Sequence, residues 1–268
     1  MKLFFTLIFL LVFLYVIHGA LSIPRLDRNW TADQKVLADI SFNEETVTIR
    51  NIRNIAYRSI DDYDVSFYDK TIKLDEIESA WYLVEPFGRF GAAHTLASFG
   101  FKDGSYIAVS AEIRKEAGEK FSPLKGILRN YELVYVVADE SDVIKLRTNY
   151  RKDEVRLYPI KADKEKIQSV FIDMLKRAQK LAMEPEFYNT ITNNCTTNLV
   201  QHVRKFSDKD IPWYDLRYLM PEHSDEVAYS AGILNTDLSM NEARQVFSIT
   251  IKAQHCSERE DFSACIRR

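Results

Sequence analysis

The order of two hydrophobic patterns limits the fold of this chain more than any other feature. Short apolar or alternating segments, typical of β-strands, fill the first half, and segments with apolar residues at helical spacing follow them. Strands are expected at residues 46–57, 80–84, 92–101, 105–113, 131–137 and 155–160. Helices are expected at residues 164–182, from Cys195 onward and at residues 240–247. Strands followed by helices predict an α+β domain in which helices pack on an antiparallel sheet.

Residues 102–104 (Lys-Asp-Gly) separate two of these strands and have the composition of a hairpin turn. A three-residue loop with Gly104 in the left-handed conformation places His94 directly opposite Glu112 and gives one mostly apolar face. A two-residue turn instead places Ile113 opposite His94 and mixes polar with apolar side chains on both faces. Because the register of a strand is set by the face that it buries, the three-residue loop is favoured.

Residues 3–17 form an apolar run that follows the positively charged Lys2, and small or turn-forming residues come after it. A short positive segment, an apolar stretch and a small-residue exit are the parts of a secretory signal. A membrane-spanning helix needs about 20 apolar residues, which this segment reaches only if residues 19–23 join it. Residues 1–23 are therefore expected to be a signal peptide or a membrane anchor, and either one directs the chain to the periplasm or cell envelope.

The 268-residue chain is 46% hydrophobic, so the part after this segment can bury a substantial core. We expect one domain at residues 24–250 and a polar C-terminal tail at residues 251–268. The net charge of −3 gives no reason to expect a nucleic acid as partner. Of the three cysteines, Cys256 and Cys265 lie in the tail, where an oxidising compartment favours a disulfide between them. Cys195 then remains unpaired, which marks it as a candidate reactive thiol.

Cys195 lies in the polar segment NNCTTN, immediately before an apolar helical pattern. Asn194 is a favoured N-cap residue, so Cys195 is expected in the first turn of a helix. The unpaired N–H groups there stabilise a thiolate and could bind an oxyanion, which makes Asn194 and Thr196 candidates for contacting substrate. The alternative is that Cys195 is a small buried apolar residue, the commonest role of a free cysteine. Its polar neighbours argue against a dry site.

His94 is the candidate base for this thiol. It lies in the strand segment GAAHTLASFGF among small residues, where an imidazole either faces a polar pocket or is a buried histidine of the core. The expected hairpin register puts Glu112 opposite it, and a carboxylate there would orient the ring and stabilise its charged form. Alternatively, Glu112 is a solvated strand residue beside Arg114. Ser110, two residues away, is a further candidate for contacting the site.

Two arginines one helical turn apart, Arg147 and Arg151, either clamp an anionic head group or lie on a solvated face. The sequence contains no glycine-rich phosphate loop, no HExxH motif and no paired-cysteine metal motif. We therefore expect the protein to use neither a metal nor a cofactor.

The segments AHTLASFGFKDGSYIAVSAEIRKE and EFYNTITNNCTTNLVQHV resemble the bacterial periplasmic domain family typified by Lnb, an apolipoprotein N-acyltransferase. The resemblance extends from about residue 30 to residue 233. It implies a circularly permuted papain-like fold related to NlpC-type peptidases, in which the histidine precedes the cysteine and a polar residue on the next strand completes the site. His94, Glu112 and Cys195 match that order, and Ser110 is the alternative third residue.

The residues and the resemblance together predict an exported thiol enzyme that forms a thioacyl intermediate. The expected activity is acyl transfer, with a phospholipid as acyl donor, a lipoprotein or peptide amine as acceptor, and association with the membrane. An NlpC-type amidase or endopeptidase of cell-wall peptides is the first alternative, and a non-catalytic envelope binding module is the second. A lipid enzyme should have an apolar entrance beside the thiol, formed by Phe87, Phe90 and Trp213, whereas a cell-wall enzyme should have an open polar groove.

Overall fold

The computed structural model describes residues 2–88 and 90–268. Its main sheet contains β1 (Asp39–Phe42), β2 (Thr46–Arg53), β5 (Phe67–Lys73), β6 (Ile77–Pro86), β7 (Ala93–Phe101), β8 (Tyr106–Arg114), β9 (Glu132–Asp139) and β10 (Arg156–Pro159). A small second sheet pairs β3 (Ala56–Tyr57) with β4 (Tyr63–Asp64). The α-helices are α1 (Lys2–Leu21), α2 (Ala32–Lys35), α3 (Pro123–Ile127), α4 (Glu140–Lys145), α5 (Lys164–Met183), α6 (Cys195–Phe206), α7 (Ser224–Ser230), α8 (Met240–Val246), α9 (Thr250–His255) and α10 (Phe262–Cys265). Short turns of other helix types are η1 (Leu74–Glu76), η2 (Leu146–Arg151), η3 (Leu216–Tyr218) and η4 (Pro221–His223).

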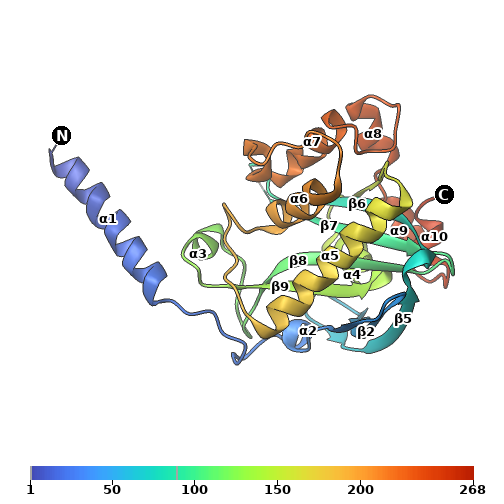
Figure 1. Ribbon diagram of the computed structural model, residues 1–268, viewed down its shortest axis with the longest axis horizontal. Coiled ribbons are helices and arrows are strands. Elements are labelled where there is room, and N and C mark those ends of the chain that lie inside the picture. Colours follow the sequence, from blue (N-terminus) through green and yellow to red (C-terminus); the bar gives the residue numbers. More distant parts are fainter. Residues whose placement is uncertain (1, 89) are drawn as a thin grey trace.

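The main sheet has the order β1-β2-β9-β8-β7-β6-β10, and β5 pairs with β2. Its strands run antiparallel to their neighbours except for a short parallel contact between β2 and β9. Helix α5 crosses one face of the sheet, and α4, α9 and α10 lie on the other (Figure 1). The expectation of an α+β domain with an antiparallel sheet and packed helices is confirmed.

Three strands, β1, β4 and β5, were not expected from the sequence, and the expected strand at residues 46–57 is divided into β2 and β3. Within β2, Asn51 takes a positive φ of 60° and the register with β5 shifts between Ile49 and Ile52, so the strand is irregular before it ends at Arg53. β1 lies within a segment that reads as a polar lead-in, and only Ile40 of its four residues is buried. Edge strands with so few buried side chains give a weak apolar pattern, which explains why the sequence did not reveal them.

The hairpin between β7 and β8 has the three-residue loop that the sequence favoured. Gly104 has a φ of +79°, the conformation that such a loop requires of its last residue. The ladder pairs Phe99 with Ile107 and Ala97 with Val109, as this register demands. The loop length and the register are therefore confirmed.

The two strands of this hairpin diverge towards their far ends. Their shared ladder ends at the pair formed by Ala97 and Val109. Beyond that point β7 stays paired with β6 as far as Ala93, and β8 stays paired with β9 as far as Arg114. The sheet consequently opens between the first residues of β7, which include His94, and the last residues of β8, which include Glu112.

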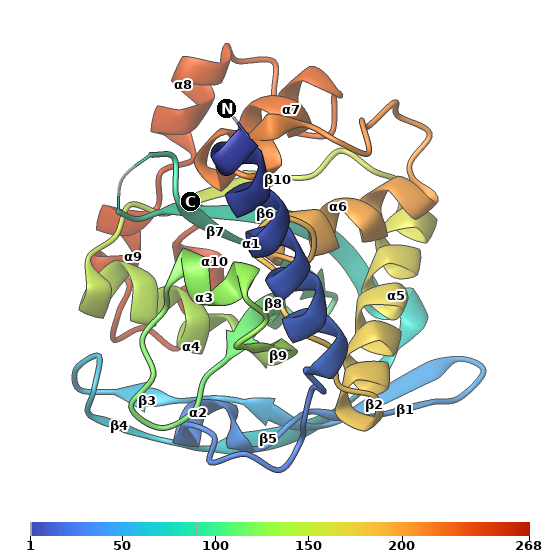
Figure 2. The ribbon, with the colours of Figure 1, turned by 90° about the vertical axis from the view of Figure 1, so that its left-hand side faces the viewer.

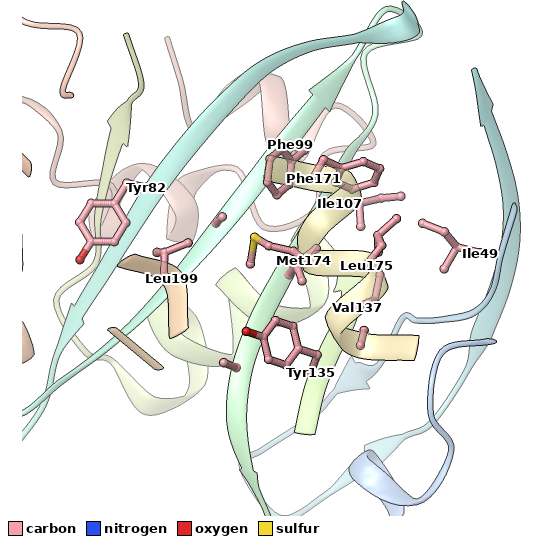
Figure 3. Packing of buried hydrophobic residues seen from close by; sticks show 14 of the residues in the cluster. Ile49, Tyr82, Phe99, Ile107, Tyr135, Val137, Phe171, Met174, Leu175 and Leu199 are labelled. Atoms are coloured by element: carbon pink, nitrogen blue, oxygen red, sulfur yellow. The ribbon is translucent and has the colours of Figure 1, made fainter. Parts of the chain in front are cut away.

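Helix α5 supplies the centre of the larger core (Figure 3), and its expected position is confirmed. Its buried side chains Phe171, Met174 and Leu175 lie against β7, β8 and β9. The rings of Phe99 and Phe171 are 4.9 Å apart between centroids. Each large apolar side chain buried in this way contributes roughly 1.5–3 kcal/mol to stability. The apolar stripe of α5 thus holds the helix across the strands that carry the candidate site.

The C-terminal residues pack against the opposite face of the sheet instead of forming the expected polar tail at residues 251–268. They form most of α9 and all of α10, and Phe262 and Ile266 are buried there beside Val143 of α4. The expected disulfide is present between Cys256 and Cys265, with the two Cα atoms 6.0 Å apart. This segment has few apolar residues, and the disulfide adds to the stability that their burial provides.

Helix α1 projects away from the body of the protein (Figures 1 and 2). Its C-terminal end contacts the segment after α3, where His18 Nε2 lies 2.8 Å from the carbonyl oxygen of Leu128. Arg129 donates a hydrogen bond of 3.0 Å to the carbonyl oxygen of Gly19. Within residues 2–88 and 90–268, none of the helices has the length and apolar character needed to cross a membrane.

Candidate active site

The N-terminus of α6 positions Cys195 through a capping box. The side chain of Asn194 accepts a 2.8 Å hydrogen bond from the backbone N–H of Thr197, and the Thr197 hydroxyl oxygen accepts one of 2.8 Å from the N–H of Asn194. Asn194 Nδ2 also donates to the carbonyl oxygen of Thr190 at 2.8 Å. The sequence NNCTTN therefore fixes the start of the helix and puts Cys195 in its first turn, as expected. N–H groups of a first turn have no partner within the helix, so they can receive an anion.

The His94 side chain reaches two polar residues of β8. Its Nε2 atom lies 2.6 Å from the hydroxyl oxygen of Ser110 and 3.5 Å from Glu112 Oε1. Ser110 in turn donates a 3.0 Å hydrogen bond to Glu112 Oε1. A proton on Nε2 satisfies this chain, because Ser110 can then accept from the imidazole while it donates to the carboxylate. This leaves Nδ1 as the nitrogen available to the thiol.

The thiol and the imidazole shift each other's protonation. Burial raises the pKa of the Cys195 thiol, but the hydrogen bond and charge of His94 and the contact with Thr95 bring it down to about 7. Burial lowers the pKa of the His94 imidazole, while Cys195 and then Glu112 raise it to about 9. Since the imidazole holds its proton more tightly than the thiol does, the charged pair is favoured at neutral pH.

Thiol and base come from opposite faces of the sheet. Side chains alternate along a strand, so His94 shares a face with Leu96 of the smaller core, whereas Thr95 points to the face covered by α6. The Thr95 hydroxyl oxygen lies 3.1 Å from that of Thr196, which anchors the first turn of α6 on β7. The opening between β7 and β8 is what allows Cys195 to interact with His94.

A buried arginine supports the carboxylate behind His94. Arg147 of η2 donates to Glu112 Oε1 at 3.2 Å and to Glu85 Oε2 at 2.6 Å. Burial raises the pKa of the Glu112 carboxyl group, but His94 and then Arg147 hold it well below its ordinary range. Arg147 is only 3% exposed, so it is an internal counter-ion. The two readings of this residue from the sequence, a clamp for an anionic head group or a member of a solvated face, are both wrong.

Glu85 is the buried residue that sequence reasoning missed. It pairs with His94 across β6 and β7, is completely buried, and also accepts a 3.2 Å hydrogen bond from Arg151. Its signal in the sequence is a single carboxylate in the apolar run AWYLVEPF. A charge in such a run must find a buried partner, which here is Arg147.

Phe87, Phe90 and Trp213, the residues expected at an apolar entrance, are not among the residues that line the apolar cavity beside α6. Phe87 packs edge-on against Phe121, with ring centroids 6.4 Å apart. Phe90 and Trp213 are 93% and 71% exposed. An apolar cavity of about 160 Å³ is formed by other residues, between α5, α6, α7 and the sheet, and its lining includes Thr196, the chain neighbour of Cys195. Among the described residues, no group of three or more histidine, cysteine, aspartate or glutamate side chains is arranged to hold a metal ion.

The fold and the site define a class: an α+β protein with a cysteine–histidine pair between the first turn of a helix and an antiparallel sheet. A sequence model of the Lnb N-terminal periplasmic domain matches residues 63–222 of this chain. Because the match covers more than half of the chain, the protein belongs to the family of Lnb N-terminal periplasmic domains. It is therefore an exported protein of the periplasm, as expected. Neither a curated protein nor a solved structure matches the chain significantly.

Proposed function

We propose that this protein is a thiol enzyme of the periplasm, with Cys195 as nucleophile and His94 as its general base and acid. The observation that carries this proposal is the hydrogen-bonded chain from His94 through Ser110 to Glu112, together with the effect of His94 in lowering the pKa of Cys195. Such a series holds the imidazole in one orientation and favours the thiolate, which is the reactive form of cysteine. Ser110 and Glu112 are positioning residues that act through His94.

The proposed reaction proceeds in two displacements. The Cys195 sulfur attacks a carbonyl carbon, and the first-turn N–H groups of α6 bind the oxyanion that forms. The bond to the leaving alcohol or amine breaks, and the His94 imidazolium gives that group its proton. An amine or water then loses a proton to His94 and attacks the thioester, after which the thiolate leaves. A charge-separated resting pair supplies both the nucleophile and the acid for the first step.

We propose acyl transfer as the activity, with a phospholipid ester as donor and the amine of a lipoprotein or peptide as acceptor. Membership of the Lnb N-terminal periplasmic domain family supports this proposal, because a periplasmic protein works in a compartment that is bounded by phospholipid membranes. A circularly permuted papain-like fold is part of the same proposal. It is supported by a histidine strand that precedes the cysteine helix in the chain and by the sheet on which that helix packs.

The second candidate function is an amidase or endopeptidase for cell-wall peptides, which would use the same residues with water as acceptor. A cysteine enzyme of this type needs an open groove for a polar peptide. The apolar lining of the cavity beside α6 favours the lipid substrate instead. The third reading, a binding module without turnover, requires an unreactive thiol, whereas the pKa of Cys195 is lowered to about 7.

Intact-protein mass spectrometry tests the proposal. The full chain is incubated with phospholipid vesicles, and a mass increase equal to one acyl group is expected on the native protein and not on Cys195→Ser. Cys256 and Cys265 are held in a disulfide and offer no thiol, so a thioester adduct can be assigned to Cys195. Cleavage of cell-wall peptides without any lipid adduct would support the amidase instead. A Cys195 thiol that resists iodoacetamide at neutral pH would leave only the binding module.

A further inference from the structure

The cavity between α5, α6 and α7 is a space of about 160 Å³ whose lining is nearly all hydrophobic. Its walls come from three helices and from β6 and β7, and they include Val170, Leu199, Val203, Ile211 and Val227. The space is partly open to the surface, so its apolar side chains stay in contact with solvent until a guest covers them. Apolar cavities of about 150 Å³ accept apolar guests. The space is therefore suited to a hydrocarbon group.

One helix face connects this cavity to the thiol. Cys195, Leu199 and Val203 are spaced four residues apart, so they form a single row along α6 that ends near Phe206. The last two, together with Phe206, line the cavity, and Thr196 borders its inner end. The row from Cys195 to Phe206 is about 16 Å long at a rise of about 1.5 Å per residue. A space of about 160 Å³ is close to that of a cavity that accepts a benzene-sized guest, so it holds part of a long alkyl chain and leaves the remainder at its open end.

Both ends of the cavity carry polar side chains, and its middle does not. At the inner end the Tyr82 hydroxyl oxygen is 2.6 Å from that of Ser224, so this wall is polar but internally hydrogen-bonded. The outer end carries Lys161, Lys209 and the ion pair between Lys166 and Asp208. Both ends therefore carry polar groups, while the middle offers only van der Waals contact, which suits an unbranched alkyl chain.

We propose that this cavity is the acyl-chain site of the enzyme and holds the alkyl chain of the thioacyl group on Cys195 along the α6 row. The chain enters beside Thr196, and its methyl end points towards the lysine end near Phe206. The identity of the chain as an acyl group rests on the proposed function, whereas the binding of a hydrocarbon to the cavity depends only on its shape and lining. The site would thus select the acyl donor by chain length.

Binding of the hydrocarbon is tested separately from chemistry. Cys195→Ser, which cannot form a thioester, is titrated with dodecanoate and with butyrate by calorimetry. Tight binding of dodecanoate and no measurable binding of butyrate are expected. In the same background Val203→Phe fills the middle of the cavity and should weaken dodecanoate binding about ten-fold or more. Val246→Phe, at an exposed position of α8, is the matched control and should leave binding unchanged.

Acylation is then measured with p-nitrophenyl acetate and p-nitrophenyl dodecanoate, by release of nitrophenol and by the mass of the adduct. In Val203→Phe, the ratio of dodecanoate transfer to acetate transfer should fall about ten-fold or more from its native value, whereas Val246→Phe should keep the native ratio. Loss of transfer with both esters would show that Val203→Phe is misfolded. In that case the binding of dodecanoate and butyrate to Cys195→Ser alone tests the proposed cavity. Equal binding of dodecanoate and butyrate to Cys195→Ser would overturn the proposed cavity. Native transfer rates with both esters in Val203→Phe would also overturn it. Dodecanoate binding without any adduct from either ester would retain the cavity as a hydrocarbon site and refute the thiol enzyme.

Discussion

Replacement of Glu112 by glutamine removes a charge and keeps the size of the side chain. Glu112 Oε1 lies 3.5 Å from His94 Nε2, and both side chains are more than four-fifths buried. At an effective dielectric constant of about 20, two unit charges at this distance attract each other by about 5 kcal/mol, an upper bound for the pair. Arg147 stays behind with its charge and then repels the imidazolium without a carboxylate between them. A loss of even one third of this attraction exceeds the roughly 1.4 kcal/mol that corresponds to a shift of one unit in the pKa of His94.

The pKa of His94 should therefore fall by one unit or more in Glu112→Gln, and the pKa of the Cys195 thiol should rise because its charged partner is weakened. The assay is the rate of iodoacetamide alkylation of Cys195 between pH 5 and 10. The midpoint for the native protein is expected near 7, where the thiol loses its proton, and that of the variant at about 8 or above. Glu78→Gln, an exposed position on β6, is the matched control. An unchanged midpoint in Glu112→Gln would refute the role given to this carboxylate.

Three further outcomes are expected. The pH profile of kcat/KM should be bell-shaped. It should rise near pH 7 as the Cys195 thiol ionises and fall near pH 9 as the His94 imidazolium loses the proton that the leaving group needs. A profile that only rises would exclude an acid role for the histidine. Arg147→Met leaves two buried carboxylates without their shared partner and should lower the free energy of unfolding in urea by about 3–5 kcal/mol, whereas Arg151→Met, at a more exposed site, should cost clearly less. Cys256→Ser with Cys265→Ser opens a short loop and should cost roughly 2–3 kcal/mol in thermal unfolding, with the alkylation rate of the active thiol unchanged.

Local signals in the sequence were sufficient for the parts of the site that lie on single elements. Gly104 determines the loop length and with it the register of the β7–β8 hairpin, which brings His94 near Ser110 and Glu112. Asn194 is a strong N-cap, so the first turn of α6 was placed correctly. The choice between Ser110 and Glu112 as partner of His94 could not be made, because strand divergence lets both contribute.

Features that depend on packing between distant segments were not accessible. The burial of Arg147 follows from the position of η2 against β6, and the partner Glu85 lies 62 residues away in the chain. Helical spacing gave no means of telling this arginine from one on a surface. The C-terminal helices α9 and α10 were hidden for a similar reason, since their few apolar residues matter only once Phe262 meets the sheet.

The opening between β7 and β8 makes the reactivity of the thiol a property of the completed fold. His94 and Cys195 meet there from opposite faces of the sheet, and about a hundred residues of chain separate them. An unfolded chain instead carries an ordinary cysteine with a pKa of about 8.5, mostly protonated and slow to react at neutral pH. The proposed nucleophile therefore gains its reactivity only when the strands and helices close around it.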